Sequence, residues 1–166
     1  MNREQLRAAQ SPLKDQYRSA PETALLTLRA TGSLGENVTC RVETGRALVE
    51  AGLHQATGGT GLSACSGDML LQALVGCAGV TMSAVATALG ITIRAGTITA
   101  EGELDFRGTL GVAKDVPVGF KRIRLLVELD TDATPSEKAK LMKLTERYCV
   151  VLQTLIRSPE ATIECS

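Results

Sequence analysis

Aromatic residues are scarce in this chain of 166 residues, which contains two Phe, two Tyr and no Trp. Stacking of nucleic-acid bases on aromatic side chains is therefore a poor prospect. Lysine plus arginine equals aspartate plus glutamate at 18 each, so no excess positive charge points to nucleic acid or to an anionic membrane. We expect no nucleic-acid partner.

Histidine is also scarce, and the cysteines show no spacing typical of disulfide or metal-binding pairs. His54 is the single histidine, which disfavours a His-rich metal site and a Ser-His-Asp triad. The cysteines are odd in number and include no Cys-x-x-Cys pair, so neither a disulfide framework nor zinc-ligand spacing is present. The first residues, MNREQLRAAQ, lack the apolar segment of a signal peptide. We expect a cytoplasmic protein with no metal and no other cofactor. The five cysteines are Cys40, Cys65, Cys77, Cys149 and Cys165.

The whole chain is 44% apolar and 22% charged, which is typical of one globular domain. We expect a single domain over 1–166, with an N-terminal helical segment in 1–20 that is interrupted near Pro12. Alternating and β-branched residues, separated by Gly-containing turns, predict the strands. The expected strands are two or three within 23–52, a strand, turn and strand over 91–108, one strand over 119–130 and a closing strand over 160–165.

Residues 67–90 form the first expected long helix, GDMLLQALVGCAGVTMSAVATALG. The 25 residues from Met69 to Ile93 carry no charge, which is long enough to cross a bilayer. The run is nevertheless rich in Ala, Gly, Ser and Thr and contains Gln72. A helix that is apolar on every side is also typical of the centre of a globular protein. We favour a buried central helix and no membrane.

A second long helix is expected over 134–158. Thr134 suits the N-cap, Pro135 the first helical position, and Glu137 completes a capping box three residues after the threonine. Apolar residues then recur at helical spacing through Leu155.

Each long helix carries one cysteine on a largely apolar face, Cys77 in the first and Cys149 in the second. Two helices crossing at these faces would bring the sulfurs together, although periodicity alone favours two inert core thiols. Apolar surroundings raise the pKa of a thiol, so a reactive Cys77 needs a nearby cation. Arg29, Arg41 and Arg46 on the expected N-terminal strands are candidates, and each also suits a solvated surface position.

The run GDMLLQALVGCAGVTMSAVATALGI resembles the core helix of the OsmC/Ohr family (osmotically inducible protein C and organic hydroperoxide resistance protein). ERYCVVLQTL resembles the family's second cysteine helix, and GELDFRG its intervening strand segment. The GGTG before the helix and the N-terminal LKDQYRSAPETALLTL fit one branch of the family. The resemblance implies an α+β fold, with curved antiparallel sheets around two long central helices, built as an intertwined homodimer.

The resemblance also implies thiol peroxidase chemistry at the dimer interface. Cys77 matches the peroxidatic cysteine and Cys149 the resolving cysteine of the family. An arginine of the N-terminal strands would activate the thiolate, with Arg41 or Arg29 as the candidate. The sequence departs from the family at Asp68, which stands where the family has glutamate in a Pro-x-Glu motif. Asp68 is expected either to hold the arginine or to act as an ordinary first-turn acid of the helix.

The activity that the resemblance implies is reduction of organic hydroperoxides through a disulfide cycle, with a dithiol as reductant. An apolar lining of Leu70, Leu74, Met142 and Leu152 would favour organic hydroperoxides over hydrogen peroxide. Cys65, just before the first long helix, is expected to be incidental. The alternative is a non-catalytic dimer of the same fold that binds a small apolar ligand or senses oxidation, which the short Asp68 and the missing proline favour.

Overall fold

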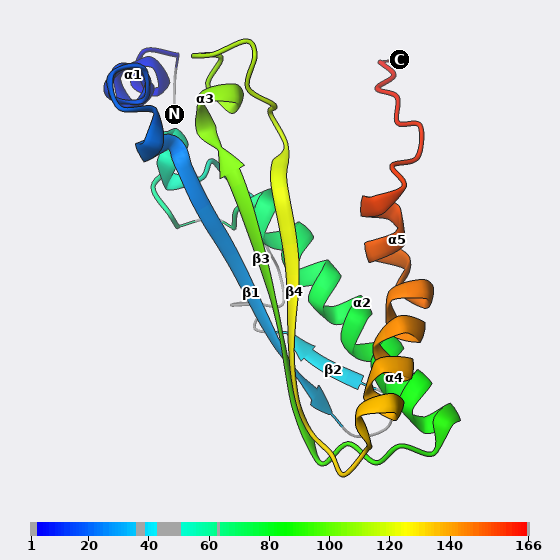
Figure 1. Cartoon of the computed structure of the whole chain (residues 1–166). Helices are drawn as coiled ribbons and strands as arrows, with labels where there is room; N and C mark the ends of the chain where they lie inside the picture. The colour runs from blue at the N-terminus through cyan, green and yellow to red at the C-terminus, as the bar shows by residue number, and fades with distance from the viewer. Residues whose placement is uncertain (1–2, 36–38, 43–50, 63, 166) are drawn as a thin grey trace.

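The structure is a computed structural model that describes residues 3–35, 39–42, 51–62 and 64–165 (Figure 1). Its regular elements are five α-helices, two short 3-10 helices and four strands among the described residues. In order they are α1 Arg3–Ser19, η1 Pro21–Ala24, β1 Leu25–Gly35, β2 Thr39–Val42, η2 Gln55–Thr57, α2 Ser66–Leu89, β3 Ala95–Asp105, α3 Phe106–Thr109, β4 Phe120–Asp130, α4 Pro135–Tyr148 and α5 Val150–Ile156.

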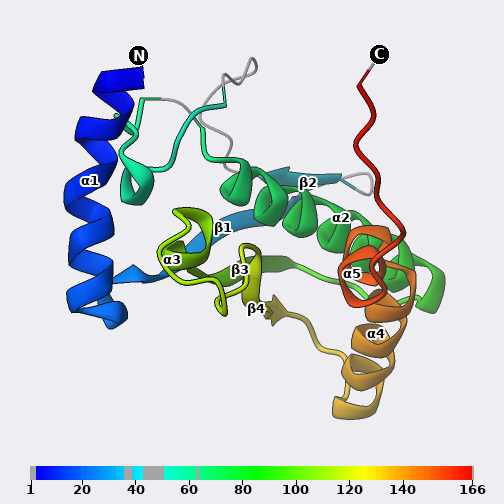
Figure 2. The same cartoon turned by 90° about the horizontal axis from the view of Figure 1, so that it is seen from above.

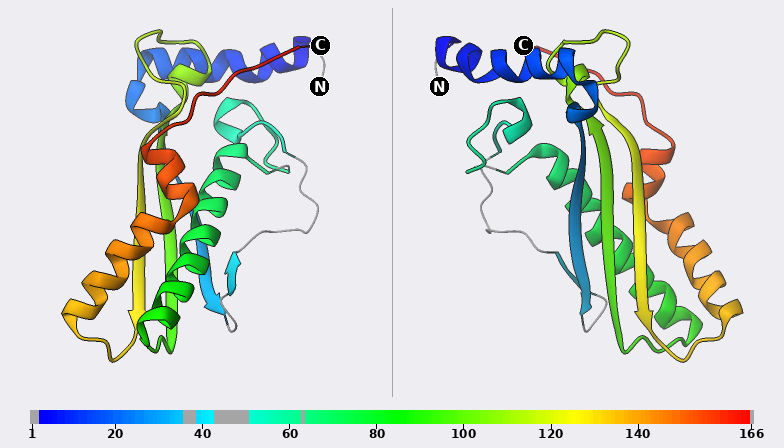
Figure 3. Two further views of the ribbon diagram at one scale, coloured as in Figure 1. Left: turned by 90° about the vertical axis from the view of Figure 1, so that its right-hand side faces the viewer. Right: turned by 60° about the vertical axis from the view of Figure 1, so that its left-hand side comes forward.

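The described strands form one four-stranded sheet in the order β2-β1-β3-β4, with every neighbouring pair antiparallel. Three of its strands, β1, β3 and β4, are 11 residues long and run side by side in Figures 1 and 3. Side chains alternate between the two faces of a strand, so Ile98 and Ala100 of β3 share one face. Both are fully buried, and this face therefore covers the core. The expected α+β fold with antiparallel strands is confirmed.

Helix α2 packs against this face of the sheet, and α4 and α5 lie beside α2 (Figures 1 and 3). Its buried positions recur at helical spacing, so one stripe of the helix faces the core while the rest is partly or fully exposed. By length and composition α2 would suffice to cross a membrane, with a mean hydropathy of 1.8, and 39% of that window is buried inside the protein. The buried stripe consists of Leu71, Leu74, Val75, Ala78, Gly79, Met82 and Ala86.

Two local signals in the sequence set the helix ends as expected. Gly90 ends α2 in the left-handed conformation, with φ of 71°, which glycine adopts without a steric penalty. At the start of α4, the Thr134 side chain accepts a hydrogen bond from the Glu137 N–H, and the Glu137 carboxylate accepts one from the Thr134 N–H. The capping box predicted from the sequence is confirmed.

Other expectations for the secondary structure are wrong. Helix α1 continues through Pro12 without an interruption. The strand, turn and strand expected over 91–108 is one continuous strand, β3, followed by the short α3. Gly102 lies within β3, where glycine is required because a Cβ at this position would collide with the ring of Phe120. Residues 160–165, where a closing strand was expected, have no regular secondary structure.

A second, smaller core joins α1 to the opposite end of the sheet from α4, as Figure 2 shows. The Tyr17 hydroxyl donates to the carbonyl of Ala56 at 2.8 Å, which ties α1 to η2. Phe106 stacks on His54 with 4.8 Å between ring centres. His54 accepts a hydrogen bond from the Ala56 N–H through Nδ1 and thereby caps η2. The single histidine thus has a structural position remote from both helix cysteines.

Candidate active site

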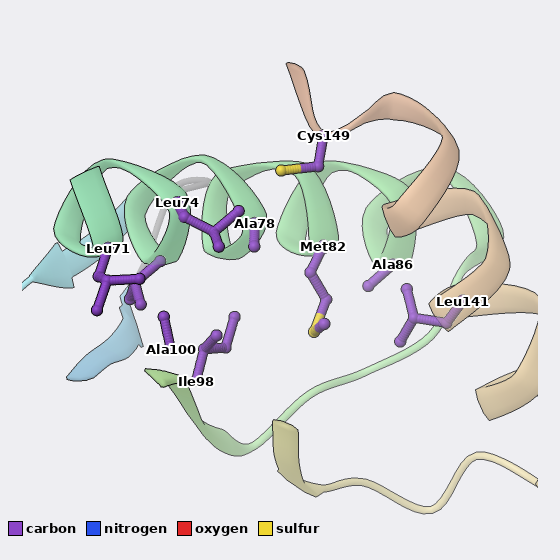
Figure 4. Packing of buried hydrophobic residues seen from close by; sticks show 10 residues of the cluster. Leu71, Leu74, Ala78, Met82, Ala86, Ile98, Ala100, Leu141 and Cys149 are labelled. Atoms are coloured by element: carbon purple, nitrogen blue, oxygen red, sulfur yellow. The ribbon is translucent and has the colours of Figure 1, made fainter. Parts of the chain in front are cut away.

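The second cysteine helix is broken at its cysteine. The helix expected over 134–158 is two helices, α4 and α5, and Cys149 between them has non-helical backbone angles (φ −70°, ψ 104°). Its side chain is fully buried, and its sulfur points from the break toward α2 (Figure 4). The break therefore places the Cys149 thiol against the core helix rather than along the surface of α4.

The break also releases backbone donors. In an unbroken α-helix the Val150 N–H would donate to the carbonyl of Glu146, and the Val151 N–H to that of Arg147. Instead, the Glu146 carbonyl accepts from the side-chain amide of Gln153 at 2.8 Å. The N–H groups of Val150 and Val151 hydrogen-bond the sulfur of Cys77 on α2. Two main-chain donors freed by the break thus converge on the thiol of the neighbouring helix.

Cys77 and Cys149 are hydrogen-bonded neighbours. The two sulfurs are separated by 72 positions in the sequence and meet where α2 crosses the junction of α4 and α5. The sequence placed them on facing helices and left the contact open. Their contact makes each thiol part of the other's electrostatic environment.

The two thiols differ in acidity. Burial raises the pKa of Cys77, but hydrogen bonds from the Val151 N–H, the Cys149 thiol, the Thr81 hydroxyl and the Val150 N–H outweigh it, so the pKa lies below the ordinary thiol value. Burial, together with the neighbouring Cys77, raises the pKa of Cys149 to about 11, against an opposing hydrogen bond from the Leu152 N–H. Of the two thiols, Cys77 is therefore the one that loses its proton first, while Cys149 keeps its proton to higher pH.

Thr81 shares the helix face of Cys77. It lies one turn after the cysteine, and its hydroxyl hydrogen-bonds the Cys77 sulfur. No sequence motif singles this threonine out, because a threonine in an apolar helix also suits a hydroxyl bonded to the preceding turn.

The arginine expected to support Cys77 falls outside what the structure describes. The side chains of Arg29 and Arg41 and the whole of Arg46 lie outside the described residues. The backbone of Arg41 is in β2, opposite Ser33 of β1, and β2 contacts α2. The role of an arginine therefore stays a prediction.

Asp68 lies in the first turn of α2, nine residues before Cys77. Nine residues of helix advance by about 13 Å and turn by about half a revolution, so the two side chains leave opposite sides of α2. Burial raises the pKa of the Asp68 carboxyl, and the nearby His54 opposes that effect. Cys65 is the N-cap residue of α2 and packs against the core without a capping hydrogen bond from its side chain.

A cavity of about 410 Å³ lies between α2, β4, α4 and α5; sequence neighbours of both cysteines line it, but neither cysteine does. Of the four residues expected to line a substrate site, Met142 and Leu152 line this cavity, whereas Leu74 is buried in the core and Leu70 is partly exposed on α2. Five lining residues share the helix face of Cys149, which helical spacing indicated, and two more alternate on β4. The full lining is Ala78, Met82, Leu125, Val127, Met142, Lys143, Thr145, Glu146, Leu152 and Ile156.

Two ion pairs are part of the sheet framework and lie outside the thiol pair. Asp105 is buried, accepts a hydrogen bond of 2.6 Å from Arg107 and caps α3. The buried Glu101 accepts one of 2.7 Å from Arg124 on the neighbouring strand. In the described part of the chain, no three His, Cys, Asp or Glu side chains gather as metal ligands would.

The fold and the site together define a class of α+β protein. In this class, a cysteine of the core helix contacts a cysteine of a second helical segment, and the two thiols form a pair near an apolar cavity. The family model described as OsmC-like protein matches residues 59–164, more than half of the chain, and the chain therefore belongs to the OsmC-like family. The expected family is confirmed.

Solved structures agree with the fold. An OsmC-like hydroperoxide resistance protein from Jannaschia sp. CCS1 is 18% identical, with a TM-score of 0.56 over 84% of this chain and 91% of that one. An OsmC-like protein from Mycoplasma pneumoniae is 17% identical, with a TM-score of 0.56 over 81% of this chain and 86% of that one. At these identities the likeness concerns the fold alone. Among curated proteins, none matches the chain significantly.

Proposed function

We propose that this protein is a thiol peroxidase that reduces organic hydroperoxides through a disulfide between Cys77 and Cys149. The observation that carries the proposal is the contact of two thiols of opposite acidity, one supported as a thiolate and one kept protonated. The thiolate is the nucleophilic form of cysteine, whereas a buried inert thiol has no such support. The Jannaschia neighbour is an OsmC-like hydroperoxide resistance protein, and this description agrees with the proposed activity.

The reaction begins when the Cys77 thiolate attacks the outer oxygen of the hydroperoxide. The O–O bond breaks, the alkoxide leaves and takes up a proton as the alcohol, and Cys77 becomes a sulfenic acid. The Cys149 sulfur then attacks the Cys77 sulfur, a disulfide forms, and the hydroxide leaves as water with the proton of Cys149. An external dithiol restores both thiols by exchange and is itself oxidised to a disulfide.

The apolar cavity supports an organic rather than an inorganic peroxide as substrate. Ala78 follows Cys77 directly in α2 and Leu152 lies three residues after Cys149, and both line the cavity, so an alkyl chain held there would lie near the two cysteines. Burying each methylene of an alkyl group is worth about 0.8 kcal/mol, a gain that hydrogen peroxide lacks.

We further infer that the protein acts as a homodimer joined through α2. Apolar side chains remain exposed along the face of α2 that also carries Cys77, with Val80 43% and Met69 38% exposed. Ala73 and Ala84 are exposed on the same face, at helical spacing. This face is uncharged and contains small residues, so it suits close packing against the same face of a second copy of the chain. A two-fold axis between the copies pairs the face with itself.

Peptide mapping under non-reducing conditions after one equivalent of cumene hydroperoxide tests the peroxidase. We expect a rapid link between the Cys77 and Cys149 peptides that dithiothreitol reverses, and steady turnover when both reagents are present. The C149S variant should accumulate a sulfenic acid that dimedone traps on Cys77. The C65S variant is the matched control and should behave as the unchanged protein. Free thiols at both helix positions, or pairing through Cys65 or Cys165, would refute the mechanism.

The alternative, a non-catalytic dimer that binds an apolar ligand or senses oxidation, is favoured by the position of Asp68 on the opposite side of α2 from Cys77. The same experiment separates the two functions. A sensor forms the disulfide once and shows no sustained consumption of hydroperoxide with dithiothreitol, whereas a ligand-binding protein forms no disulfide at all.

A further inference from the structure

The cavity near the thiol pair is lined by one buried polar residue that the proposed reaction does not use. Thr145 lies on α4 and lines the cavity, with only 5% of its surface exposed. In the described part of the chain, its hydroxyl oxygen is a buried polar atom without a hydrogen-bond partner. Even the carbonyl of the preceding helical turn, the usual acceptor for a helical threonine hydroxyl, does not accept from it.

A buried hydroxyl without a partner is unfavourable, and native proteins satisfy nearly all such groups. Most of the surrounding lining is apolar and offers no partner: Ala78, Met82, Leu125, Val127, Met142 and Leu152. The two charged lining residues, Lys143 and Glu146, are exposed. The hydroxyl is therefore placed to bond a polar atom that a ligand brings into the cavity.

The position of Thr145 relative to the thiols sets the shape of such a ligand. Its carbonyl accepts the Cys149 N–H at 2.9 Å, so the two residues are one helical turn apart. One turn advances by about 6 Å along the helix axis. The cavity volume of about 410 Å³ lies within the range of roughly 300–1,000 Å³ that small-molecule sites occupy. A ligand with one oxygen at the sulfurs and another at Thr145 therefore needs an apolar chain between them.

We propose that Thr145 is a specificity-determining residue and that the preferred substrates are hydroperoxides whose alkyl chain carries a second oxygen, as a hydroxyl or carbonyl group. The inference rests on the proposed peroxidase function and names its substrate class. A threonine hydroxyl both donates and accepts, so it suits either group. A site built around a buried polar group discriminates against a plain alkyl substrate, because that substrate leaves the group unpaired.

Binding of unreactive alcohols measures this preference without any turnover. Isothermal titration of the C77S protein with 1-octanol and with a series of octanediols places the second oxygen at successive positions along one chain. We expect one diol of the series to gain affinity relative to 1-octanol through Thr145. The T145V variant keeps the side-chain shape and removes the hydroxyl. In this variant, the affinity for that diol relative to 1-octanol should fall by about fivefold to tenfold.

Two further variants separate recognition from structure. T145S keeps a hydroxyl and should keep the preference for the diol, whereas T87V removes an exposed hydroxyl of α2 and should change nothing. An affinity ratio that is equal in the unchanged, T145V and T87V proteins would overturn the proposal. So would a failure of every octanediol to bind, which is the result expected if a second copy of the chain fills the cavity. A Thr145-dependent preference in a protein that does not turn over hydroperoxides would refute the peroxidase and leave the ligand class of the cavity standing.

Discussion

Removal of the Thr81 hydroxyl tests whether hydrogen bonds hold the thiolate on Cys77. The T81V variant keeps the branched shape of the side chain and deletes one of the donors to the sulfur. A hydrogen bond to a charged group is worth about 1.5–3 kcal/mol, and the half-buried site takes the lower end because water competes. Since the bond stabilises the charged form, its loss raises the pKa of Cys77. About 1.4 kcal/mol corresponds to a tenfold smaller thiolate population at neutral pH.

The rate at which Cys77 is alkylated measures this change in the thiolate population. A more basic thiolate is intrinsically more nucleophilic, with a Brønsted slope of about 0.4–0.5, so a tenfold loss of thiolate becomes a net slowing of about threefold at neutral pH. At a pH where Cys77 is fully ionised in both proteins, T81V should instead react about threefold faster. The pH–rate profiles for iodoacetamide at the Cys77 peptide, read by mass spectrometry, should therefore cross.

The assay uses proteins whose cysteines other than Cys77 and Cys149 are replaced by serine. Cys149 contributes little to the reaction, because its pKa is about 11 and its side chain is fully buried. T87V is the control, since its hydroxyl bonds the Ser83 carbonyl on the exposed side of α2. Superimposable profiles for T81V and the unchanged protein would show that the threonine does not support the thiolate, and the same displacement in T87V would assign the effect to the helix.

Three further results are expected. V80E should give the mass of a single protomer in light scattering, because two charges would meet at the proposed α2 interface, and an unchanged dimer would refute that interface. D105N should lower the free energy of unfolding by about 3 kcal/mol at pH 7, because it leaves Arg107 without its buried partner. The hydrogen bond to Arg107 lowers the pKa of Asp105, so the difference in unfolding free energy between D105N and the unchanged protein should shrink as pH falls below about 4. A difference that stays constant with pH would contradict the ion pair. The Cys77–Cys149 disulfide should stabilise the protein against urea by about 4 kcal/mol, since it closes a loop of roughly 70 residues, and an unchanged midpoint on adding dithiothreitol would argue against the link.

The elements that the sequence predicted well carry their own local signals. The capping box at Thr134 and the glycine at Gly90 act within one helical turn, so each fixes a helix end regardless of the rest of the fold. Of the four residues expected to line a substrate site, the two on the second cysteine helix, Met142 and Leu152, line the cavity. These predictions needed no knowledge of how the helices cross.

The features that the sequence mispredicted or left open depend on residues that are distant in the chain. Gly102 suggests a turn until Phe120 is placed against it, since only then does the missing Cβ become a requirement of the strand. The contact between Cys77 and Cys149 depends on the crossing of two helices, which periodicity leaves undetermined. The sequence around Cys149 contains neither a glycine nor a proline that would indicate the break. The apolar residues keep their helical spacing across it.

That break between α4 and α5 has a consequence for how thiol chemistry is recognised in related proteins. The Val150 and Val151 N–H groups support the Cys77 thiolate as main-chain donors, and any amino acid except proline supplies such a donor. Activation of this kind leaves no mark in an alignment of side chains, because valine is replaceable by many residues without loss of the donor. A survey that searches only for a basic residue beside the cysteine will classify such proteins as inactive. A survey of backbone geometry at the second cysteine will find them.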